Sequence, residues 1–491
     1  MNGLPAPQAR TLLKEALTGA LAGTTHPSPT SRLYITGNVR SALLSDMFVV
    51  TGAVGEGKSV LRRVLVDPAL RGPAARACRL PRLAQARVVT GFAPGCDESA
   101  IDPVTVANLT AAGIQPLQLW TAVLLTVSGD IEMSSLATWA ERCAWVASTP
   151  DALDRYAARC AAEDSGVLVL FDGLEMLHSD RATVERHVQA VLDLSTALAE
   201  ASALFPSTSR PRIKLFVRPD VLVGLRVGRA DGRWRHHKAD LSWVRGSYSA
   251  DRWVALYGLL FQLLGNHPGP EAAAFRSLHA GWQLEEDGSF DTPNDLRSDP
   301  DTQRHLLSLL IDPHIDGTPR RGTFYSWLPS YLQDAAGRVS PRSFLAALLG
   351  AVDFTADSHP AHDRAVHHAA ARIGMLTGTR ERAKELARSA PWIADALNPL
   401  SGLQVPIPPD QALDLWSRST LLGRPPAPGG PVGPRHANGY GLIEDLISVG
   451  AMRLRTNGDL DLPDLLRLAH GLGRRGGVPM RDRTGEVATA R

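Results

Sequence analysis

An eight-residue segment, Gly52-Ala-Val-Gly-Glu-Gly-Lys-Ser59, constrains the fold of this sequence more than any other feature. It follows a short apolar run with β-branched residues, Asp46–Thr51, and precedes the helix-compatible run Val60–Val66. The pattern G-x-x-x-x-G-K-S between a strand and a helix is typical of a loop that binds phosphates. The sequence therefore predicts an α/β fold whose core, residues 36–248, is a three-layer P-loop NTPase with a parallel sheet.

The residues of this loop have separable roles toward a triphosphate. Glycines let the backbone curl so that its N–H groups point at the phosphates, and the N-terminus of the next helix adds a partial positive charge. Lys58 is expected on the β- and γ-phosphates of ATP, and the Ser59 hydroxyl on Mg²⁺. The residues expected to hold the nucleotide are Gly52, Gly55, Glu56, Gly57, Lys58, Ser59 and Val60.

A magnesium site also needs a carboxylate from a neighbouring strand. The run Ser165–Asp172 supplies one, because its apolar residues end in Asp172. Another buried strand is expected at Ala86–Phe92, between this run and the phosphate-binding loop. We expect Asp172 to hold the metal together with Ser59; the alternative is a strand-end aspartate that only caps the next turn.

Three residues are candidates for the catalytic steps. Glu175, three residues after the expected metal ligand, would polarise the attacking water, or else it is a solvated residue at a helix start. Arg218 ends a third strand pattern and would sense the γ-phosphate, unless it pairs with Asp220. Arg342 lies in the first turn of a helix, where a cation is disfavoured by the dipole, so an anionic partner is expected. That partner is either ATP or a nearby carboxylate.

These stretches together resemble bacterial P-loop ATPases related to the STAND and KAP groups of AAA+-like NTPases. The resemblance implies ATP hydrolysis, which would be slow because no glutamate directly follows Asp172, and a place in prokaryotic conflict or antiphage systems. The segment Ser340–Leu345 is similar to the start of the lid helix in origin-recognition-type ATPases, which implies a second-sensor role for Arg342. The other segments that carry the resemblance are Gly52–Ser59, Asp172–Glu175, Phe216–Asp220, Leu241–Trp243, Trp253–Leu264 and Gly322–Pro329.

Changes of composition along the chain indicate the domain organisation. Prolines alternate with glycines over 423–439, which predicts a semi-rigid linker. After it, Asn457-Gly458 between two alternating runs predicts a hairpin, and the flanking helices suit a winged-helix-like module. We expect a helical N-terminal segment (1–35), the core (36–248), a helical lid with the second-sensor motif (249–350), a helical region (351–422), the linker (423–439), the winged-helix-like domain (440–479) and a tail (480–491).

Two further stretches bear on function. Asp287–Asp316 is acidic and interrupted by prolines, which predicts a solvated loop. Four histidines cluster in the sequence, but His362 and His367 lie five residues apart rather than four, and no acid or cysteine completes a metal-ligand set. We therefore expect surface histidines at 359, 362, 367 and 368.

Composition excludes several classes of protein. No uncharged apolar run reaches the roughly 18 residues that a membrane span needs, and Lys14 and Glu15 interrupt the only apolar stretch near the N-terminus. The cysteines show no C-x-x-C spacing. No membrane contact and a cytoplasmic location are therefore expected.

The main hypothesis is an ATP-hydrolysing switch or motor subunit of a bacterial defence-type assembly. It would depend on a separately encoded effector, because no nuclease, protease or membrane segment is recognisable in the chain. The alternative is a DNA-binding ATPase of the loader, segregation or origin-recognition type that uses residues 440–479. A homo-oligomer is compatible with both hypotheses, and a small-molecule kinase is a third.

Overall fold

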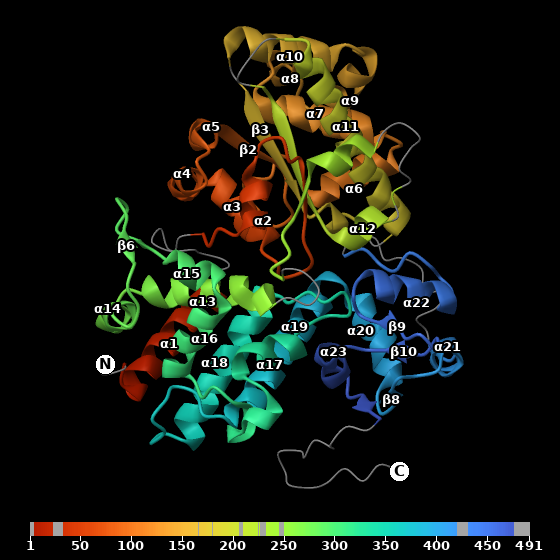
Figure 1. The fold of residues 1–491 in the computed structure, drawn as a ribbon. Helices are drawn as coiled ribbons and strands as arrows, with labels where there is room; N and C mark the ends of the chain where they lie inside the picture. Colours follow the sequence, from red (N-terminus) through yellow and green to blue (C-terminus); the bar gives the residue numbers. More distant parts are fainter. Residues whose placement is uncertain are drawn as a thin grey trace.

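The computed structural model describes residues 4–22, 33–164, 166–178, 180–205, 210–223, 225, 232–244, 250–419 and 431–475. The expected tail (480–491) and residues 423–430 of the expected linker lie outside these ranges. Figure 1 shows a sheet flanked by helices, a helical lid beneath it, and a C-terminal unit beside the lid. No described helix has both the length and the apolar character that crossing a bilayer demands.

Within the described residues, five parallel strands form the central sheet, in the order β2-β3-β4-β1-β5. The parallel sheet of the expected core is thus confirmed. Sequence reasoning did not anticipate β5, because three residues beginning with a lysine are too few and too polar to show a strand pattern. The strands are β1 (Val49–Thr51), β2 (Arg87–Phe92), β3 (Val167–Asp172), β4 (Arg212–Val217) and β5 (Lys238–Asp240).

Alternate residues of each strand face opposite sides of the sheet, and each side has its own hydrophobic core. Val50 and Leu170 pack on one side, whereas Val49 and Val169 pack on the other. Helices cover both sides, which gives the three layers. The first side carries α2 (Gly37–Leu43), α3 (Lys58–Val66), α4 (Pro68–Ala77) and α5 (Pro81–Gln85); the second carries α6 (Pro103–Ala111), α7 (Pro116–Ser128), α8 (Ile131–Ser134), α9 (Trp139–Ser148), α10 (Ala152–Glu163), α11 (Arg181–Ala203) and α12 (Pro219–Val223).

The strand order brings the expected site residues to one edge of the sheet. β4 lies between β1 and β3, so the carboxyl ends of these three strands are neighbours. The phosphate-binding loop leaves β1, Asp172 ends β3, and Arg218 directly follows β4. Ligands of open parallel sheets bind at this edge, outside the carboxyl ends of the strands.

A fully buried lysine fastens the sheet to the helix that precedes it. The Lys214 ammonium donates hydrogen bonds to the carbonyls of Ala42 (2.7 Å), Leu44 (2.9 Å) and Met47 (2.7 Å). Burial lowers the pKa of Lys214 to about 7. The side chain therefore holds the end of α2 and the turn before β1 against β4.

Replacing Lys214 with methionine should lower the free energy of unfolding by about 3 kcal/mol, because three buried carbonyls lose their donor. Lys238→Met, which changes an exposed strand lysine, should have little effect. Between about pH 7 and pH 9 the unfolded chain binds a proton that native Lys214 has released, so wild-type stability should rise with pH relative to the variant. Urea unfolding at both pH values measures this; equal stability of the two variants would contradict it.

The lid is a helical unit to which the N-terminal helix also belongs. Leu12, Leu13 and Leu17 of α1 (Ala6–Ala22) are buried in the lid core, and Figure 1 shows α1 beside α13 and α18. The other lid elements are η3 (Ala250–Trp253), α13 (Val254–Gly265), α14 (Pro270–Arg276), β6 (Gln283–Leu284), β7 (Phe290–Asp291), α15 (Asn294–Ser298), α16 (Pro300–Leu310), η4 (Ile315–Gly317), η5 (Pro319–Arg321), α17 (Phe324–Tyr331), α18 (Pro341–Ser358) and α19 (Ala370–Ser389).

The prediction of a solvated loop over Asp287–Asp316 is wrong. Much of this stretch is helical, and the proline that suggested a break instead begins a helix. The Asp299 side chain accepts hydrogen bonds at the N-cap of α16, and Pro300 occupies the first position, where a missing N–H costs nothing. Leu306 and Leu307 are then buried in the lid core.

The C-terminal unit has a single hydrophobic core that crosses an expected domain boundary. Residues from Leu386 to Leu472 contribute to it, so the expected regions 351–422 and 440–479 share one core. The hairpin expected around Asn457-Gly458 is confirmed, with Leu454 paired to Leu460. The elements are α20 (Pro391–Leu397), η6 (Asn398–Leu400), β8 (Gln404–Val405), α21 (Pro409–Ser417), α22 (Gly439–Ser448), β9 (Arg453–Leu454), β10 (Leu460–Asp461), α23 (Asp464–Ala469) and β11 (Gly473–Arg474).

Candidate nucleotide-binding site

The glycine-rich loop curls at the carboxyl end of β1. The Gly52 amide donates to the Val217 carbonyl (3.3 Å), which joins the start of the loop to β4. Gly55 and Gly57 have φ angles of +80° and +102°, a region that side chains disfavour, so glycine is required at both positions. Gly57 is the N-cap of α3, whose first-turn amides have no acceptor within the helix. The loop thus has the curled backbone and helix N-terminus that bind phosphates.

The two expected metal ligands lie together beside the lysine. The Ser59 hydroxyl donates to Asp172 Oδ2 at 3.5 Å, although the residues come from different elements. The Lys58 ammonium donates to the carbonyl of Gly52 at 2.6 Å, on the inside of the loop. Arg62, one turn further along α3, also reaches Asp172 Oδ2 at 3.3 Å. Sequence reasoning missed Arg62, whose position four residues after Lys58 was the available signal.

Glu175 lies close to Asp172 and is buried. One of its carboxylate oxygens, Oε2, has no hydrogen-bond partner among the described residues. Burial raises the pKa of Asp172 to about 6, and the nearby Glu175 carboxylate adds to the rise, against the opposing effects of Lys58 and Arg62. Two buried carboxylates beside a serine hydroxyl form an oxygen-rich donor set of the kind that Mg²⁺ and its bound waters prefer.

Residues 431–435, at the end of the expected linker, contact the turn that carries Glu175. The Val432 amide donates to the Glu175 carbonyl at 2.9 Å, and the Val432 side chain is buried in the core of the sheet. The next residue, Gly433, accepts a hydrogen bond from Arg181 at 3.3 Å. The described part of the predicted linker is therefore packed onto the NTPase core at the turn that carries Glu175.

Lys58, Ser59, Asp172 and Glu175 line one cavity of about 940 Å³, a size suited to a nucleotide. Its charged end is formed by the glycine-rich loop, Asp172 and Glu175. Apolar side chains from α2, α4 and α18 line another part, where a base could be buried. Sequence reasoning missed this apolar part, because its residues come from separate helices; they include Val39, Leu70, Pro73, Ala74 and Leu345.

Arg218 lines the cavity but is also held by a buried ion pair. Its guanidinium bonds both carboxylate oxygens of Asp220, at 3.0 and 2.9 Å, and the Ser389 carbonyl at 2.8 Å. Burial opposes ionisation of Asp220, but Arg218 and Arg181 outweigh it and hold the pKa of this carboxyl at about 2. The structure thus contains the Arg218–Asp220 pair that the sequence left as the alternative to a sensor, and it adds a contact with the lid.

Arg342 has the carboxylate partners that its helix position required. Its Nε lies 3.2 Å from Glu385 Oε1, and one terminal nitrogen lies 3.6 Å from Glu381 Oε1. Arg342 and Glu385 both line the cavity. The structure thus shows the carboxylate partner considered from the sequence, and it places Arg342 on the wall of the cavity.

Replacing Arg342 with alanine should weaken ATP binding about 10-fold and ADP binding less, if the guanidinium exchanges Glu385 for the γ-phosphate. Titration of a fluorescent nucleotide, displaced by ATP or by ADP, measures both affinities. Arg372→Ala is the control, because Arg372 pairs with Asp316 in the same lid and does not line the cavity. Unchanged affinity for both nucleotides would make Arg342 a structural residue only.

The lid packs directly on the glycine-rich loop, a contact that no local sequence signal indicates. Arg382 donates to the Val54 carbonyl, and Ser340 donates to the Gly55 carbonyl at 3.3 Å. A side chain at Gly55 would collide with the Glu385 carboxylate. These contacts join residues that lie about 300 positions apart in the chain.

Glu56 lines the cavity, and its side chain has partners of its own in the loop and in the lid. Its Oε2 accepts hydrogen bonds from the Ala53 amide (2.5 Å) and from Arg338 (3.0 Å), so the carboxylate is engaged within the loop and with the lid. Its carbonyl accepts from the Trp243 indole at 3.0 Å. Of the other residues expected to hold the nucleotide, Gly55, Gly57, Lys58, Ser59 and Val60 line the cavity, whereas Gly52 does not.

The sheet order and the glycine-rich loop together define a P-loop NTPase fold. No family model matches the sequence, and no curated protein matches it. Among solved structures, the chain is similar to the ORC2 protein of Aeropyrum pernix in its ADPNP–ADP complexes, with 14% identity over 94% of this chain and 92% of that chain and a TM-score of 0.34. The ADP form of that protein matches with 15% identity over 94% and 90% and a TM-score of 0.27.

Proposed function

We propose that this chain binds ATP with Mg²⁺ and hydrolyses it slowly, as a nucleotide-dependent switch. The observation that carries the proposal is the meeting of Ser59 and Asp172, at 3.5 Å, beside Lys58 and at one end of a large cavity. A strand-end aspartate that served only as a cap would have no reason to meet the residue after the loop lysine. This juxtaposition is what a metal–triphosphate complex requires.

Each residue has a specific task in this proposal. Lys58 would exchange the Gly52 carbonyl for the β- and γ-phosphates, and Ser59 and Asp172 would hold the ion. Bound Mg²⁺ would neutralise phosphate charge. Glu175 accepts a proton from the attacking water through its unpartnered oxygen, and its burial keeps that carboxylate away from bulk solvent. Arg218 contacts the γ-phosphate and so senses whether ATP or ADP is bound.

The switch follows from the contacts between the lid and the loop. Arg342 is held by Glu381 and Glu385 of α19, and Arg218 by the carbonyl of Ser389 at the end of the same helix. A γ-phosphate that draws Arg342 away changes the contacts of α19 with α18, and one that draws Arg218 away changes the contacts of α19 with the core. Since α19 leads directly into the C-terminal unit, nucleotide state and the position of that unit become coupled.

The direct test is equilibrium binding and turnover by the purified full chain. We expect micromolar ATP binding that strengthens with Mg²⁺, and ADP release at a rate well below that of fast motors. Substitution Asp172→Asn should remove the Mg²⁺ dependence while leaving some metal-free binding. Failure of the wild-type chain to bind ATP, with or without Mg²⁺, would refute the proposal.

We also propose that the C-terminal unit is winged-helix-like and contacts a protein partner. Its elements follow the order α20, β8, α21, α22 and the β9–β10 hairpin, and Ile407, just after β8, bridges to Leu460 of β10. The helix that would enter a DNA groove, α22, contains no lysine or arginine and exposes Glu444. Protein contact is therefore favoured over the DNA contact considered for residues 440–479.

Two arginines of the hairpin and one of β11 support the same choice. Arg453, Arg455 and Arg474 all converge on the buried carboxylate of Asp461, at 2.9, 3.2 and 3.5 Å. Their charge is partly neutralised within the unit, which weakens any attraction to phosphates. Steeply salt-dependent binding of duplex DNA by the full chain would reverse this conclusion and favour the loader or origin-recognition alternative.

The finer biological role stays a prediction. It comprises a separately encoded effector, a defence-type assembly of the STAND or KAP kind, homo-oligomerisation and a cytoplasmic location. The reading frames beside this one in its genome test the first two directly, since an adjacent toxic effector is expected.

A further inference from the structure

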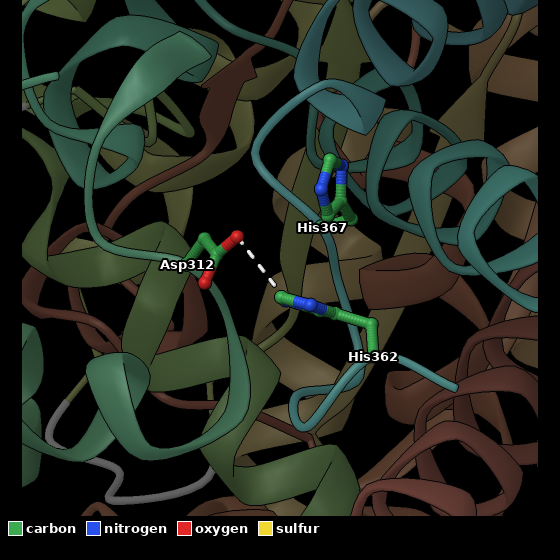
Figure 2. Close-up of side chains that lie close together, drawn as sticks. All are labelled: Asp312, His362 and His367. Carbon is green, nitrogen blue, oxygen red and sulfur yellow. Dashed lines mark ion pairs between the residues drawn. The ribbon is translucent and has the colours of Figure 1, made fainter. Parts of the chain in front are cut away.

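Four histidines gather in the loop between α18 and α19, outside the nucleotide cavity. His359, His362, His367 and His368 lie within this loop, and Asp312, which follows α16, approaches them from a segment some 50 positions earlier. Figure 2 shows the Asp312 carboxylate facing the His362 ring, with the His367 ring near this pair. None of these residues lines the nucleotide cavity.

We propose that Asp312, His362 and His367 form a binding site for a divalent transition metal of the zinc type. One ligand atom from each residue lies within 4.8 Å of the other two. Ligands around a tetrahedral zinc ion are about 3.3 Å apart, so small side-chain movements would complete the site. Two imidazoles and one carboxylate are a donor set that suits Zn²⁺ better than Mg²⁺ or Ca²⁺.

The closest pair faces a common point instead of forming an ordinary hydrogen bond. His362 Nε2 lies 3.1 Å from Asp312 Oδ2. Yet this buried nitrogen has no partner with hydrogen-bond geometry among the described residues. The other ring nitrogen, Nδ1, lies 3.5 Å from the Asp363 carboxylate. A carboxylate on the far side of a histidine is the usual support of a metal-bound imidazole, since it fixes which nitrogen is free to bind.

His367 lies among the other histidine rings of the loop. Its ring centroid lies 3.9 Å from that of His359 and 3.9 Å from that of His368. The ring centroid of His362 lies 4.7 Å away. The rings of the two proposed histidine ligands are therefore neighbours.

Both oxygens of Asp312 have other partners, but Oδ2, which accepts one amide hydrogen, keeps a second lone pair toward the histidines. Arg364 pairs with Oδ1 at 2.8 Å, and the His368 amide donates to Oδ2 at 2.8 Å. Asp312 would therefore bind through Oδ2 alone, and with His362 and His367 it makes three protein ligands. Zinc sites with three protein ligands keep a further position for water. A metal here would tie the loop to the segment that follows α16.

The test is Zn²⁺ binding by the nucleotide-free full chain, measured by competition with a chromophoric chelator. We expect one equivalent bound with a dissociation constant below about 10 µM. The double variant His362→Ala/His367→Ala should lose that equivalent, and Asp312→Asn should weaken it about 10-fold or more. His279→Ala is the matched control, because His279 also pairs with an aspartate of the lid, Asp295, at 2.9 Å.

Co²⁺ added in place of Zn²⁺ gives a second measurement. Visible absorption typical of a four-coordinate site should appear in the wild-type chain and in His279→Ala, and be absent from the double variant. Asp312→Asn preserves side-chain shape, so it keeps the test valid if the double variant fails to fold. Equal Zn²⁺ stoichiometry in wild type, double variant and Asp312→Asn would overturn the proposal, as would a wild-type chain that binds no Zn²⁺ below about 10 µM.

Discussion

Replacing Lys58 with alanine should weaken ATP binding by about 100-fold or more, which amounts to loss of measurable binding. The ammonium lies inside the glycine-rich loop, 2.6 Å from the Gly52 carbonyl, and among the described residues no other lysine lines the cavity. Without it, the β- and γ-phosphates lose the charge-assisted hydrogen bonds of this ammonium. Displacement of a fluorescent ATP analogue from the full chain measures the effect.

Lys14→Ala is the control for this experiment. Lys14 is an exposed lysine of α1 that pairs with Asp353 of α18, so the variant removes the same charge without touching the loop. Circular dichroism should show that both variants are folded. If Lys58→Ala retained wild-type affinity, the glycine-rich loop would have a structural role and the proposed nucleotide site would be wrong.

Replacing Glu175 with glutamine should lower the rate of ATP hydrolysis by about 100-fold while leaving ATP affinity within a few-fold of wild type. The amide keeps the size of the side chain but cannot accept a proton from water. The variant should therefore retain ATP after gel filtration, whereas the wild-type chain should release ADP. Single-turnover hydrolysis of radiolabelled ATP separates the chemical step from binding.

Glu444→Gln serves as the matched control, since Glu444 is exposed on α22 in the C-terminal unit. An unchanged turnover rate in Glu175→Gln would assign water activation to another group. Loss of binding together with turnover would instead indicate that the Glu175 carboxylate helps to hold the metal ion.

The strands and loop of the core were accessible from sequence because their signals are local. The run ending in Asp172 is continuous and apolar, the run ending at Val217 is apolar after Lys214, and the glycine spacing of 52–59 needs no partner to be recognised. The residue types around Lys58 thus predicted both the edge of the sheet and the chemistry expected there. β5 was missed because its three residues derive their conformation from pairing with β1.

Contacts between distant segments set the limit of sequence reasoning. The sequence did not identify the carboxylate partners of Arg342. They are Glu381 and Glu385, which lie on the next long helix of the lid. The same holds for His362, whose sequence neighbours supply no buried carboxylate. Asp312 reaches it only because Ile311 pairs with Val366 and aligns the two segments. In Asp287–Asp316, burial of leucines at helical spacing outweighed an acidic, proline-containing composition.

The hydrogen bond from Val432 to the Glu175 carbonyl has a mechanical consequence. Residues 431–435 press against the back of the turn that carries this glutamate, and α22 begins only a few residues later. A protein that binds α22 and the β9–β10 hairpin would displace residues 431–435, and with them the Glu175 carboxylate relative to the attacking water. The distal unit could then work as a trigger for hydrolysis from outside the cavity, without itself touching nucleotide.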